Sequence, residues 1–460
     1  MRARDIGLDG EAGAAAPSGI VAIVGRPNVG KSTLFNRLAG RRQAIVDELA
    51  GLTRDRLYGI TEWRGRAFTV VDTAGLETDV RRADSGLADL VAGTQEQARQ
   101  AIAEADLCLL LLDVREGVTA LDEAIAAQLR RGGKPVVLAG NKSESATNQH
   151  FAHELYRLGL GEPILISALQ GKDTGDLLDR IVDRLPPAEE GSIVAEDLSL
   201  AIIGRPNVGK SSLLNAIVGA DRALVSPVAG TTRDAVDTIV ERDGERIRLV
   251  DTAGIRRRGL VHTNVEHYSV LRALKAIERA DVGIVVVDAS AGVVGRDRHI
   301  AGYASDAGKG LVVVVNKWDL VDEETRGDPA FLKAFQAAFA FTPGVPVVTA
   351  SALEGRNIVR VLDTARAAAR SRATRIPTPA LNNLIRSAVD EHPPPHRNGR
   401  RLKILYATQA ASAAPTIVLF VNDPELLQTS YGRYLENRIR AVFGFGGVRL
   451  RMVARRRSDS

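Results

Sequence analysis

The sequence predicts an α/β protein in which two copies of one doubly wound, mostly parallel domain are followed by a small α+β domain. Three observations support this fold class. Short apolar runs alternate with helix-like segments over most of the chain, as in parallel sheets covered by helices. The octapeptide Gly-Arg-Pro-Asn-Val-Gly-Lys-Ser occurs at 25–32 and again at 204–211. The alternating pattern then changes after residue 371.

The chain of 460 residues is longer than one hydrophobic core usually serves, so several domains are expected. The N-terminal tail lacks the apolar segment of a secretory signal, and we expect it to be disordered. The predicted organisation is a disordered tail over 1–18, a first domain over 19–185, a polar linker over 186–197, a second domain over 198–371, a third domain over 372–455 and a basic tail over 456–460.

Shorter motifs show that the first two domains are copies of each other. Thr53-Arg54-Asp55 recurs at 232–234 and Asp72-Thr73-Ala74-Gly75 recurs at 251–254, both 179 residues later, like the octapeptide. The expected strands of the first copy lie at 20–24, 68–71, 107–112, 135–138 and 163–166, with helices such as 32–38 and 121–130 between them. Those of the second copy lie at 200–203, 247–250, 282–287, 311–315 and 345–348.

The C-terminal segment is expected to fold in the order α-β-β-α-β. We predict a helix over 379–391, strands over 402–407 and 416–421, a long helix over 424–443 and a last strand over 448–453. The long helix is not preceded by the G-x-x-G loop that clamps an RNA backbone in KH domains. The glycine-rich run at 444–447 follows the helix, so we interpret it as a C-cap.

Charge is unevenly distributed along the chain. Residues 371–460 contain 15 Lys and Arg against 6 Asp and Glu, whereas the net charge of the whole chain is only +5. A basic end on an acidic body indicates a polyanionic partner, although a solvated arginine-rich surface would give the same count. The single cysteine, Cys108, lies in an apolar run, and no segment is apolar enough to span a membrane. We therefore expect a cytoplasmic monomer without membrane contact.

Each octapeptide has the composition of a phosphate-binding loop, since it follows a predicted strand and precedes a predicted helix. Its glycines let backbone N–H groups turn toward a phosphate chain, aided by the positive end of the helix. The lysine is expected to reach the β- and γ-phosphates, and the serine to ligate Mg²⁺. The loop residues are Gly25, Arg26, Pro27, Asn28, Val29, Gly30, Lys31 and Ser32, and Gly204, Arg205, Pro206, Asn207, Val208, Gly209, Lys210 and Ser211.

An acidic motif follows a strand in each copy. Its aspartate can hold Mg²⁺ through water while its glycine N–H contacts the γ-phosphate. Thr53 and Thr232 lie 22 residues after the loop lysines, and are candidates for a catalytic switch threonine that binds Mg²⁺ only when the γ-phosphate is present. The motifs, with the next position, are Asp72, Thr73, Ala74, Gly75 and Leu76, and Asp251, Thr252, Ala253, Gly254 and Ile255.

A further pair of motifs can read the base. The Asp319 carboxylate can accept two parallel hydrogen bonds from guanine, which adenine cannot supply. In the first copy the longer Glu144 can make the same fork only if the loop shifts or the side chain folds back. The base-reading residues are Asn141, Lys142, Ser143, Glu144, Ser167 and Ala168 in the first copy, and Asn316, Lys317, Trp318, Asp319, Ser351 and Ala352 in the second.

Hydrolysis needs a group that orients water or compensates charge. The position of the water-orienting glutamine of Ras-like enzymes is taken by Leu76 and Ile255, which cannot hydrogen-bond through their side chains. We expect the loop arginines to lie on the surface rather than to act as arginine fingers, which leaves room for an accessory activator. The amide oxygens of Asn28 and Asn207 can help to hold a monovalent cation against the phosphates.

Together, the two octapeptides, the two Asp-Thr-Ala-Gly motifs and the α-β-β-α-β tail resemble the Der (EngA) family of bacterial GTPases over residues 19–455. The resemblance implies two P-loop GTPase domains and a KH-like domain, and hydrolysis of GTP to GDP with Mg²⁺, stimulated by K⁺ at the loop asparagines. It also implies a role in assembly of the large (50S) ribosomal subunit through nucleotide-dependent association with its RNA. Ala50, Ala74 and Glu144 depart from the family pattern and bear on the nucleotide selectivity of the first site.

A second interpretation stays open from the residues alone. The chain can be a nucleotide-gated RNA-binding adaptor in which one site remains occupied and only stabilises the fold.

Overall fold

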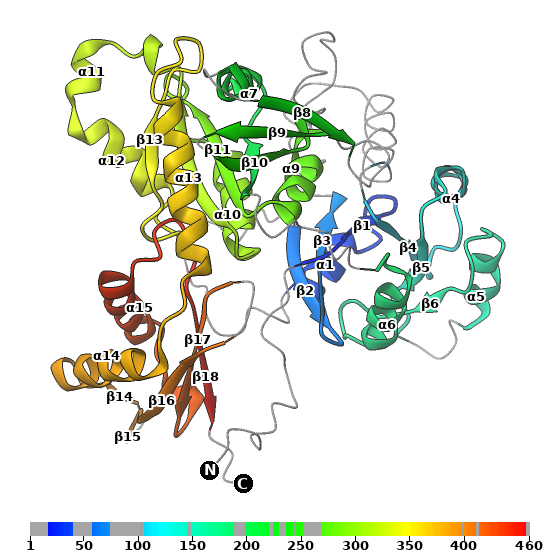
Figure 1. Cartoon of the computed structure of the whole chain (residues 1–460). Helices are drawn as coiled ribbons and strands as arrows, with labels where there is room; N and C mark the ends of the chain where they lie inside the picture. Colours follow the sequence, from blue (N-terminus) through cyan, green and yellow to red (C-terminus); the bar gives the residue numbers. More distant parts are fainter. Residues whose placement is uncertain are drawn as a thin grey trace. The chain divides into compact units, whose positions relative to one another are not determined.

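The computed structural model describes residues 17–39, 58–73, 103, 105–144, 149–187, 198–219, 224–229, 236–242, 244–252, 268–397, 399–410 and 414–456. The chain divides into two compact units (Figure 1). One contains the first copy of the repeat, and the other contains the second copy and the C-terminal domain. The predicted fold class is confirmed. Most of the two tails and of the linker lies outside the described ranges, within which no helix is long and apolar enough to cross a membrane.

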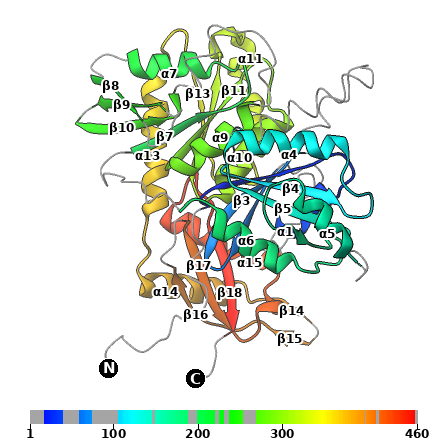
Figure 2. The ribbon, with the colours of Figure 1, turned by 90° about the vertical axis from the view of Figure 1, so that its right-hand side faces the viewer.

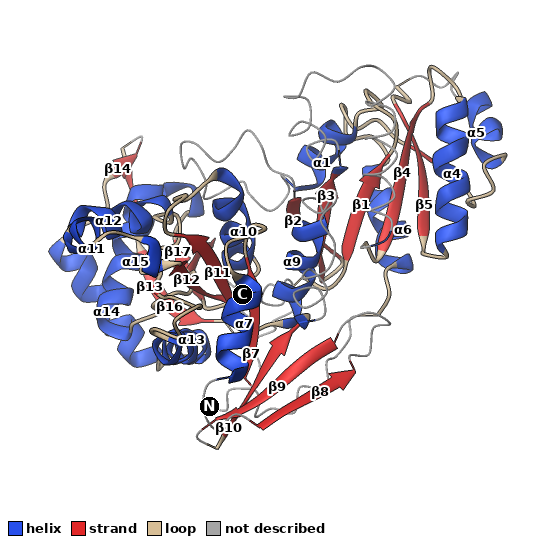
Figure 3. Ribbon diagram, turned by 90° about the horizontal axis from the view of Figure 1, so that it is seen from above, coloured by secondary structure: helices blue, strands red, loops and turns tan. Residues whose placement is uncertain are grey.

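The sheet of the first copy has the strand order β2-β3-β1-β4-β5-β6, parallel except for β2. Leu34 of α1 and Leu178 of α6 pack in one apolar cluster with Leu109 of β4. The buried side of α4 packs outside this cluster, so helices cover both faces of the sheet (Figure 3). The elements are β1 (Ile20–Val24), α1 (Lys31–Ala39), β2 (Tyr58–Trp63), β3 (Arg66–Asp72), β4 (Leu107–Asp113), α4 (Ala120–Gly132), β5 (Val136–Asn141), α5 (Gln149–Tyr156), β6 (Ile164–Leu165) and α6 (Thr174–Arg184).

The sheet of the second copy has the order β13-β12-β11-β7-β10-β9-β8. Its central strands β11 and β12 are buried over their whole length, which explains their valine-rich sequences. The elements are β7 (Leu198–Ile203), α7 (Lys210–Gly219), β8 (Leu224–Ala229), β9 (Val236–Arg242), β10 (Glu245–Val250), α9 (Tyr268–Arg279), β11 (Val282–Asp288), α10 (Gly295–Asp306), β12 (Gly310–Asn316), η4 (Trp318–Leu320), α11 (Glu323–Gly327), α12 (Pro329–Ala338), β13 (Val347–Thr349) and α13 (Ile358–Ala373).

The sequence analysis missed the antiparallel strands β2, β8 and β9 at one edge of each sheet. Strand β2 alternates half-exposed and buried residues over its first four positions and is half-exposed over the last two. Such an edge strand buries only one face, so it lacks the continuous apolar run that marks the central strands.

The C-terminal domain has the predicted α-β-β-α-β order, with a small additional hairpin, β14–β15. Its three-stranded sheet is ordered β16-β17-β18, with β16 antiparallel and β18 parallel to β17. Helices α14 and α15 pack on one face of this sheet (Figure 1). The elements are α14 (Thr378–Glu391), β14 (His396–Arg397), β15 (Arg400–Arg401), β16 (Ile404–Gln409), β17 (Thr416–Val421), η5 (Pro424–Leu426), α15 (Thr429–Phe443) and β18 (Arg451–Arg456).

Two boundaries in this domain differ from the prediction. The long helix begins at Thr429, because 424–426 forms a separate 3-10 turn whose Leu426 enters the core. The last strand begins at Arg451 rather than Val448, because the preceding segment hydrogen-bonds to α15 instead of to β17. Arg440 donates to the Phe445 oxygen at 2.7 Å and to the Val448 oxygen at 2.9 Å. The predicted C-cap is confirmed at Gly444, whose φ is 88°.

The C-terminal domain packs against the second copy, whose last helix, α13, leads directly into it (Figure 2). The Leu311 N–H at the start of β12 donates to the Gly447 oxygen at 2.7 Å, and the Gly447 N–H donates to the Gly344 oxygen at 2.9 Å. A Cβ at Gly447 would lie 2.6 Å from the Leu311 oxygen, so only glycine permits this approach. The two domains therefore form one compact unit.

Candidate nucleotide site

The two phosphate loops join β1 to α1 and β7 to α7, as the sequence predicts. Their glycines permit two close backbone approaches. A Cβ at Gly25 would lie 2.3 Å from the Leu111 oxygen, and one at Gly30 would lie 2.3 Å from Nδ2 of Asn141. Both glycines have positive φ, 152° and 98°. The second copy shows the same pattern at Gly204 and Gly209, so both loops curl as a phosphate cradle requires.

Each loop lysine folds back over its own loop. Nζ of Lys31 donates to the Gly25 oxygen at 2.7 Å and to the Arg26 oxygen at 3.0 Å. Lys210 makes the same pair of bonds to the oxygens of Gly204 and Arg205. The ammonium groups thus lie inside the curl of the loops, where a phosphate chain would be held.

In each candidate Mg²⁺ set the serine lies on the helix after the phosphate loop, and the aspartate lies at the end of the strand beside the one that leads into the loop. Ser32 and Ser211 are exposed in the first turns of α1 and α7. Asp72 is buried at the end of β3, whereas Asp251 follows β10 with a left-handed φ of 54°. Outside the described residues lie Thr53, Ala74, Gly75 and Leu76, and Thr232, Ala253, Gly254 and Ile255.

The threonines that follow the aspartates are buried, as are the valines of the loops. Thr73 Oγ1 donates to the Ile23 oxygen at 2.7 Å, and Thr252 Oγ1 lies 2.8 Å from Thr238 Oγ1. These bonds anchor the start of each acidic motif to the sheet. The remaining loop positions are buried at Val29 and Val208, half-exposed at Pro27 and Pro206, and exposed at Asn28 and Asn207.

Asn141 and Asn316 have a role that sequence reasoning missed. The Asn141 amide nitrogen donates to the Val29 oxygen at 2.8 Å, and its amide oxygen accepts the Ala168 N–H at 2.9 Å. Asn316 makes the equivalent bonds at 2.8 and 3.0 Å. Each asparagine therefore fixes the phosphate loop relative to the Ser-Ala segment. A side chain that donates and accepts at once meets this need, which explains the residue type.

The motif lysines are held by aspartates that the sequence analysis did not select. Lys142 Nζ lies 2.6 Å from Oδ2 of Asp113, and Lys317 Nζ lies 2.6 Å from Oδ2 of Asp288. Burial alone would raise the pKa of Asp288, but hydrogen bonds from Lys317 and Ser290 lower it to about 2. Both lysines have left-handed backbones, with φ of 69° and 60°. The sequence did contain a signal for these partners, because both β4 and β11 end in an aspartate.

In the second copy the base-reading carboxylate is positioned by a serine. Ser351 Oγ donates to Oδ1 of Asp319 at 2.5 Å, and Ser351 is fully buried. Asp319 lies in the turn η4, whose first residue, Trp318, is buried with its ring centroid 5.8 Å from that of Phe331. Ala352 is also buried, beside Ser351. The packed tryptophan thus anchors the turn that carries the carboxylate.

In the first copy the longer carboxylate makes the corresponding bond. Ser167 Oγ donates to Oε1 of Glu144 at 3.0 Å, and a second partner, Arg115, donates to Oε2 at 2.5 Å. Burial acts to raise the pKa of Glu144, but the bonds from Ser167 and Arg115 hold it below its ordinary value. Arg115 was missed because it lies 29 residues upstream of Glu144. Ser143 and Ala168, which neighbour Glu144 and Ser167 in the sequence, are buried.

The expectation of surface placement for the loop arginines is wrong. Nε of Arg205 lies 3.0 Å from both carboxylate oxygens of Asp297, and Nε of Arg26 lies 3.3 Å from Asp122. The two aspartates are fully buried near the start of α10 and α4. Burial raises the pKa of Asp297 despite Arg205. The arginines therefore serve to fix the loops to α4 and α10.

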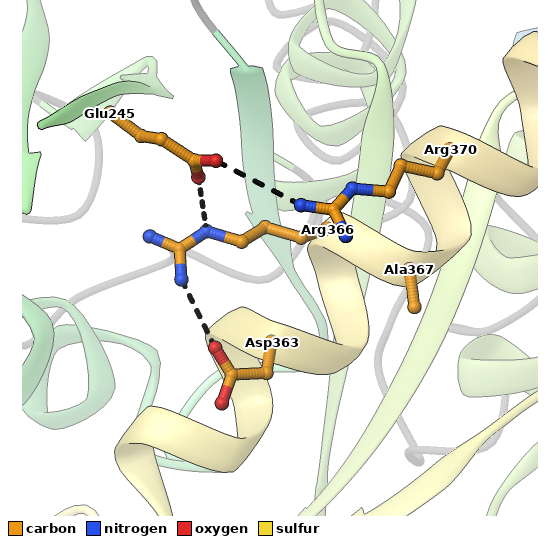
Figure 4. A pocket seen from close by; sticks show the side chains of 5 residues that line it. All are labelled: Glu245, Asp363, Arg366, Ala367 and Arg370. Atoms are coloured by element: carbon orange, nitrogen blue, oxygen red, sulfur yellow. Dashed lines mark hydrogen bonds and ion pairs between the residues drawn. The ribbon is translucent and has the colours of Figure 1, made fainter. Parts of the chain in front are cut away.

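A pocket of about 280 Å³ lies elsewhere, where α13 meets β10 (Figure 4). Arg366 of α13 pairs with Glu245 of β10 at 2.7 Å and with Asp363 at 3.0 Å, while Arg370 lies 3.9 Å from Glu245. The cations in this pocket already have carboxylate partners, and no predicted site residue lines it. We interpret it as part of the packing of α13, distinct from the nucleotide site.

Comparisons with known proteins match both repeats and the tail. The family described as 50S ribosome-binding GTPase matches residues 20–142 and 199–317. The family described as KH-domain-like of EngA bacterial GTPase enzymes, C-terminal, matches residues 375–455.

Curated relatives named GTPase Der match almost the whole chain. The protein of Thermomicrobium roseum is 51% identical over 443 residues, covering 96% of each chain. Those of Pelotomaculum thermopropionicum and Desulforamulus reducens are 48% and 47% identical, each covering 96% of this chain and 99% of the relative. With both nucleotide domains and the C-terminal domain included in these matches, the chain belongs to the Der family of GTPases.

Proposed function

We propose that this GTPase acts in assembly of the large (50S) ribosomal subunit, through nucleotide-dependent association with its RNA or particles in the cytoplasm. The observation that carries the proposal is the compact unit formed by the second nucleotide domain and the basic C-terminal domain, joined by the Leu311–Gly447 bond. A change of nucleotide at β10 and α7 can therefore alter how the basic domain is presented. The family match to a 50S ribosome-binding GTPase supports the choice of subunit.

We further propose that GTP binds at both loops as the sequence predicts. Lys31 and Lys210 would bind the β- and γ-phosphates, and Asp319 and Glu144 the guanine base. Ser32 and Asp72, the latter through water, would hold Mg²⁺ in the first site, with Ser211 and Asp251 in the second. These residues fit the ion because hydroxyl and carboxylate oxygens are its preferred ligands. Thr53 and Thr232 would complete the two sets.

Hydrolysis then depends on charge compensation at the loops. The ion pairs of Arg26 and Arg205 with buried aspartates argue against either as an arginine finger. Asn28 and Asn207 remain the candidates to hold K⁺, because each is exposed at the tip of its loop with a left-handed φ, 68° and 64°. A bound cation there would offset the negative charge that develops on the phosphate oxygens.

The cation proposal is tested by replacing sodium with potassium at constant ionic strength. Single-turnover hydrolysis should rise in potassium, and Asn28→Ala and Asn207→Ala should each reduce the rise in their own domain. Equal rates in the two salts would remove the cation and return attention to an activating partner.

The assembly proposal is tested by sedimentation of the full chain with purified 50S and 30S particles, in GTP, GDP and no nucleotide. We expect co-sedimentation with 50S particles that depends on nucleotide and weakens with salt, since phosphate contacts release counterions. Binding to 30S particles alone, or binding that ignores the nucleotide, would contradict it.

A second candidate function is the adaptor with one non-hydrolysing site. Glu144 pairs with Arg115, whereas no ion pair to Asp319 occurs among the residues that the structure describes, and this favours a different use of the two sites. Single-turnover hydrolysis by Lys31→Ala and Lys210→Ala separates these alternatives.

A further inference from the structure

The C-terminal sheet has an outer face, away from α14 and α15, that the nucleotide chemistry does not use. Ala407, Leu419 and Ala454 form one row across the three strands and pack in the core beneath the helices. The neighbouring row, Tyr406, Phe420 and Arg455, points the other way, because successive residues of a strand face opposite sides.

A β-bulge decides which residue reaches this face. The pairing of β16 with β17 slips between Ile404 and Tyr406, so Leu405 is an extra residue without a partner. Ile404 packs toward the core, so in a regular strand Tyr406, two residues later, would face the core and Ala407 would face outward. In the structure it is Ala407 that packs in the core. The bulge instead turns Tyr406 outward, where it is 40% exposed, beside Leu405 at 50%. Bulges commonly redirect a side chain at functional sites.

The redirected ring stacks on its neighbour across the strands. The centroids of Tyr406 and Phe420 lie 4.4 Å apart, and their planes differ by 2°. Tyr406 is 40% exposed whereas Phe420 is half-buried on the central strand, so a third planar group would reach the pair at the Tyr406 ring. Tyr406 lies on the edge strand, so a ring entering from that side meets its exposed face. Unpaired nucleobases are planar groups of this kind, and aromatic side chains on sheets bind them in several RNA-binding domains.

The charge around the pair is positive. Arg455 lies directly across from Phe420, and Lys403 precedes β16 between Leu402 and Ile404, which both pack toward the core. Lys403 is exposed. The nearby Asp423 is already paired with Arg400 at 3.0 Å. A cationic border around an exposed aromatic stack suits a polyanion that carries planar bases better than it suits an apolar protein surface.

We propose that the Tyr406–Phe420 pair is a stacking platform for unpaired bases of single-stranded RNA, with Arg455 and Lys403 binding the adjoining phosphates. The inference rests on the proposed association with ribosomal RNA and names where on the chain unpaired nucleotides bind. Duplex RNA cannot use the platform, because its bases are stacked and paired inside the helix.

The test measures binding of the full chain to a fluorescein-labelled 12-nucleotide oligo(A) and to a 12-base-pair RNA duplex, by fluorescence anisotropy. Tyr406→Ala and Phe420→Ala should each weaken oligo(A) binding at least about five-fold, or about 1 kcal/mol. Tyr406→Leu should weaken it as well, because it keeps apolar volume but removes the ring. Arg455→Gln should lower the slope of log affinity against log salt, which the ring substitutions should leave unchanged.

Tyr156→Ala is the matched control, since Tyr156 is 48% exposed on α5 in the other unit. It should leave oligo(A) binding unchanged, and far-UV circular dichroism and thermal unfolding of the full chain should show that the Tyr406 and Phe420 variants are folded. Ring variants that bind oligo(A) like Tyr156→Ala would overturn the platform. Equal losses for oligo(A) and duplex would also overturn it, because stacking does not act on paired bases. A Tyr406→Leu variant with full affinity would do the same.

The platform and the assembly function fail in different ways. A wild-type chain that sediments with 50S particles but does not bind oligo(A) overturns the platform and leaves the assembly role standing. Ring-dependent binding of oligo(A) without binding to either ribosomal particle supports the platform and contradicts the assembly role. Ring variants that lose 50S binding but keep full oligo(A) binding overturn the platform and assign this face to a ribosomal protein.

Discussion

The two base-reading corners have the same framework but different carboxylate partners. In each, an asparagine joins the phosphate loop to the Ser-Ala segment, and a lysine pairs with a buried aspartate. The position two residues after that aspartate is Ser290 in the second copy, where its hydroxyl bonds Asp288 at 2.7 Å. In the first copy it is Arg115, which pairs with Glu144. The first copy thus combines a longer carboxylate, Glu144, with a cation, Arg115, at the position where the second copy has a serine. The asparagine and lysine contacts around them are the same in both copies.

A second difference between the copies concerns an equivalent pair of lysines at the start of β5 and β12. Lys134 donates to the Ala105 oxygen at 2.7 Å and is half-exposed. Lys309 donates to the Glu278 oxygen at 2.8 Å but is only 5% exposed, next to the C-terminal domain. Burial and the nearby Arg372 lower the pKa of Lys309 to about 8. A charged lysine at this position is therefore less favourable in the second copy, where the side chain is buried, than in the first, where it is half-exposed.

The largest expected effect comes from removing the loop lysines one at a time. Lys31→Ala and Lys210→Ala should each slow single-turnover GTP hydrolysis in their own domain about 100- to 1,000-fold, because a positioned cation near the developing charge is lost. Two hydrolysis phases, each abolished by one variant, would show two working sites. An unchanged time course for Lys31→Ala would instead support the adaptor with a structural first site.

Substitution of the base-reading carboxylate should weaken guanine recognition more in the second copy than in the first. Asp319→Asn should weaken GTP binding about 10- to 100-fold and favour xanthosine triphosphate, since the amide offers a donor where guanine needs an acceptor. Glu144→Gln should have a smaller effect, because Arg115 and Ser167 already engage both oxygens. The measurement is competitive binding of the two nucleotides to each variant. Unchanged GTP affinity for Asp319→Asn, with no gain for xanthosine triphosphate, would contradict the assignment.

The different burial of Lys134 and Lys309 predicts that they contribute differently to the pH dependence of stability. Because the pKa of Lys309 is lowered in the folded state, the unfolded state binds more protons between about pH 8 and 10.5, and stability should rise with pH across that window. Lys309→Met should therefore raise stability at pH 7, by at most about 3 kcal/mol, and flatten the rise. Urea midpoints from pH 7 to 10 check this. Lys134→Met is the control, and an equal change in both variants would show that burial is not the cause.

The smallest effect is expected for Arg115→Ser, which gives the first corner the serine of the second. The Arg115 side chain is 60% exposed, so its pair with Glu144 is worth about 1 kcal/mol or less. GTP affinity of the first site should change by about five-fold or less, and the change should shrink in high salt. An effect that persists at 1 M salt would mean that Arg115 contacts the nucleotide directly.

Much of the fold was predictable because the central strands are buried on both faces. The runs at 20–24, 107–112 and 282–287 are apolar throughout, and the structure places β1, β4 and β11 there. The antiparallel strands β2, β8 and β9 were missed because polar residues and a proline interrupt their apolar positions, so their pattern is weaker than that of the central parallel strands. The start of α15 was misplaced because Leu426 enters the core in a separate turn, which periodicity cannot distinguish from a helical residue.

For the site, the sequence by itself determined which chemistry is present, since loop glycines, lysines and carboxylates are recognised by type and spacing. Only the tertiary structure decided their partners. Arg26 and Arg205 lie against buried aspartates about a hundred residues away, Glu144 meets Arg115, and a bulge turns Tyr406 outward. Such pairings depend on which strands become neighbours, and charge or periodicity along the chain carries no record of that.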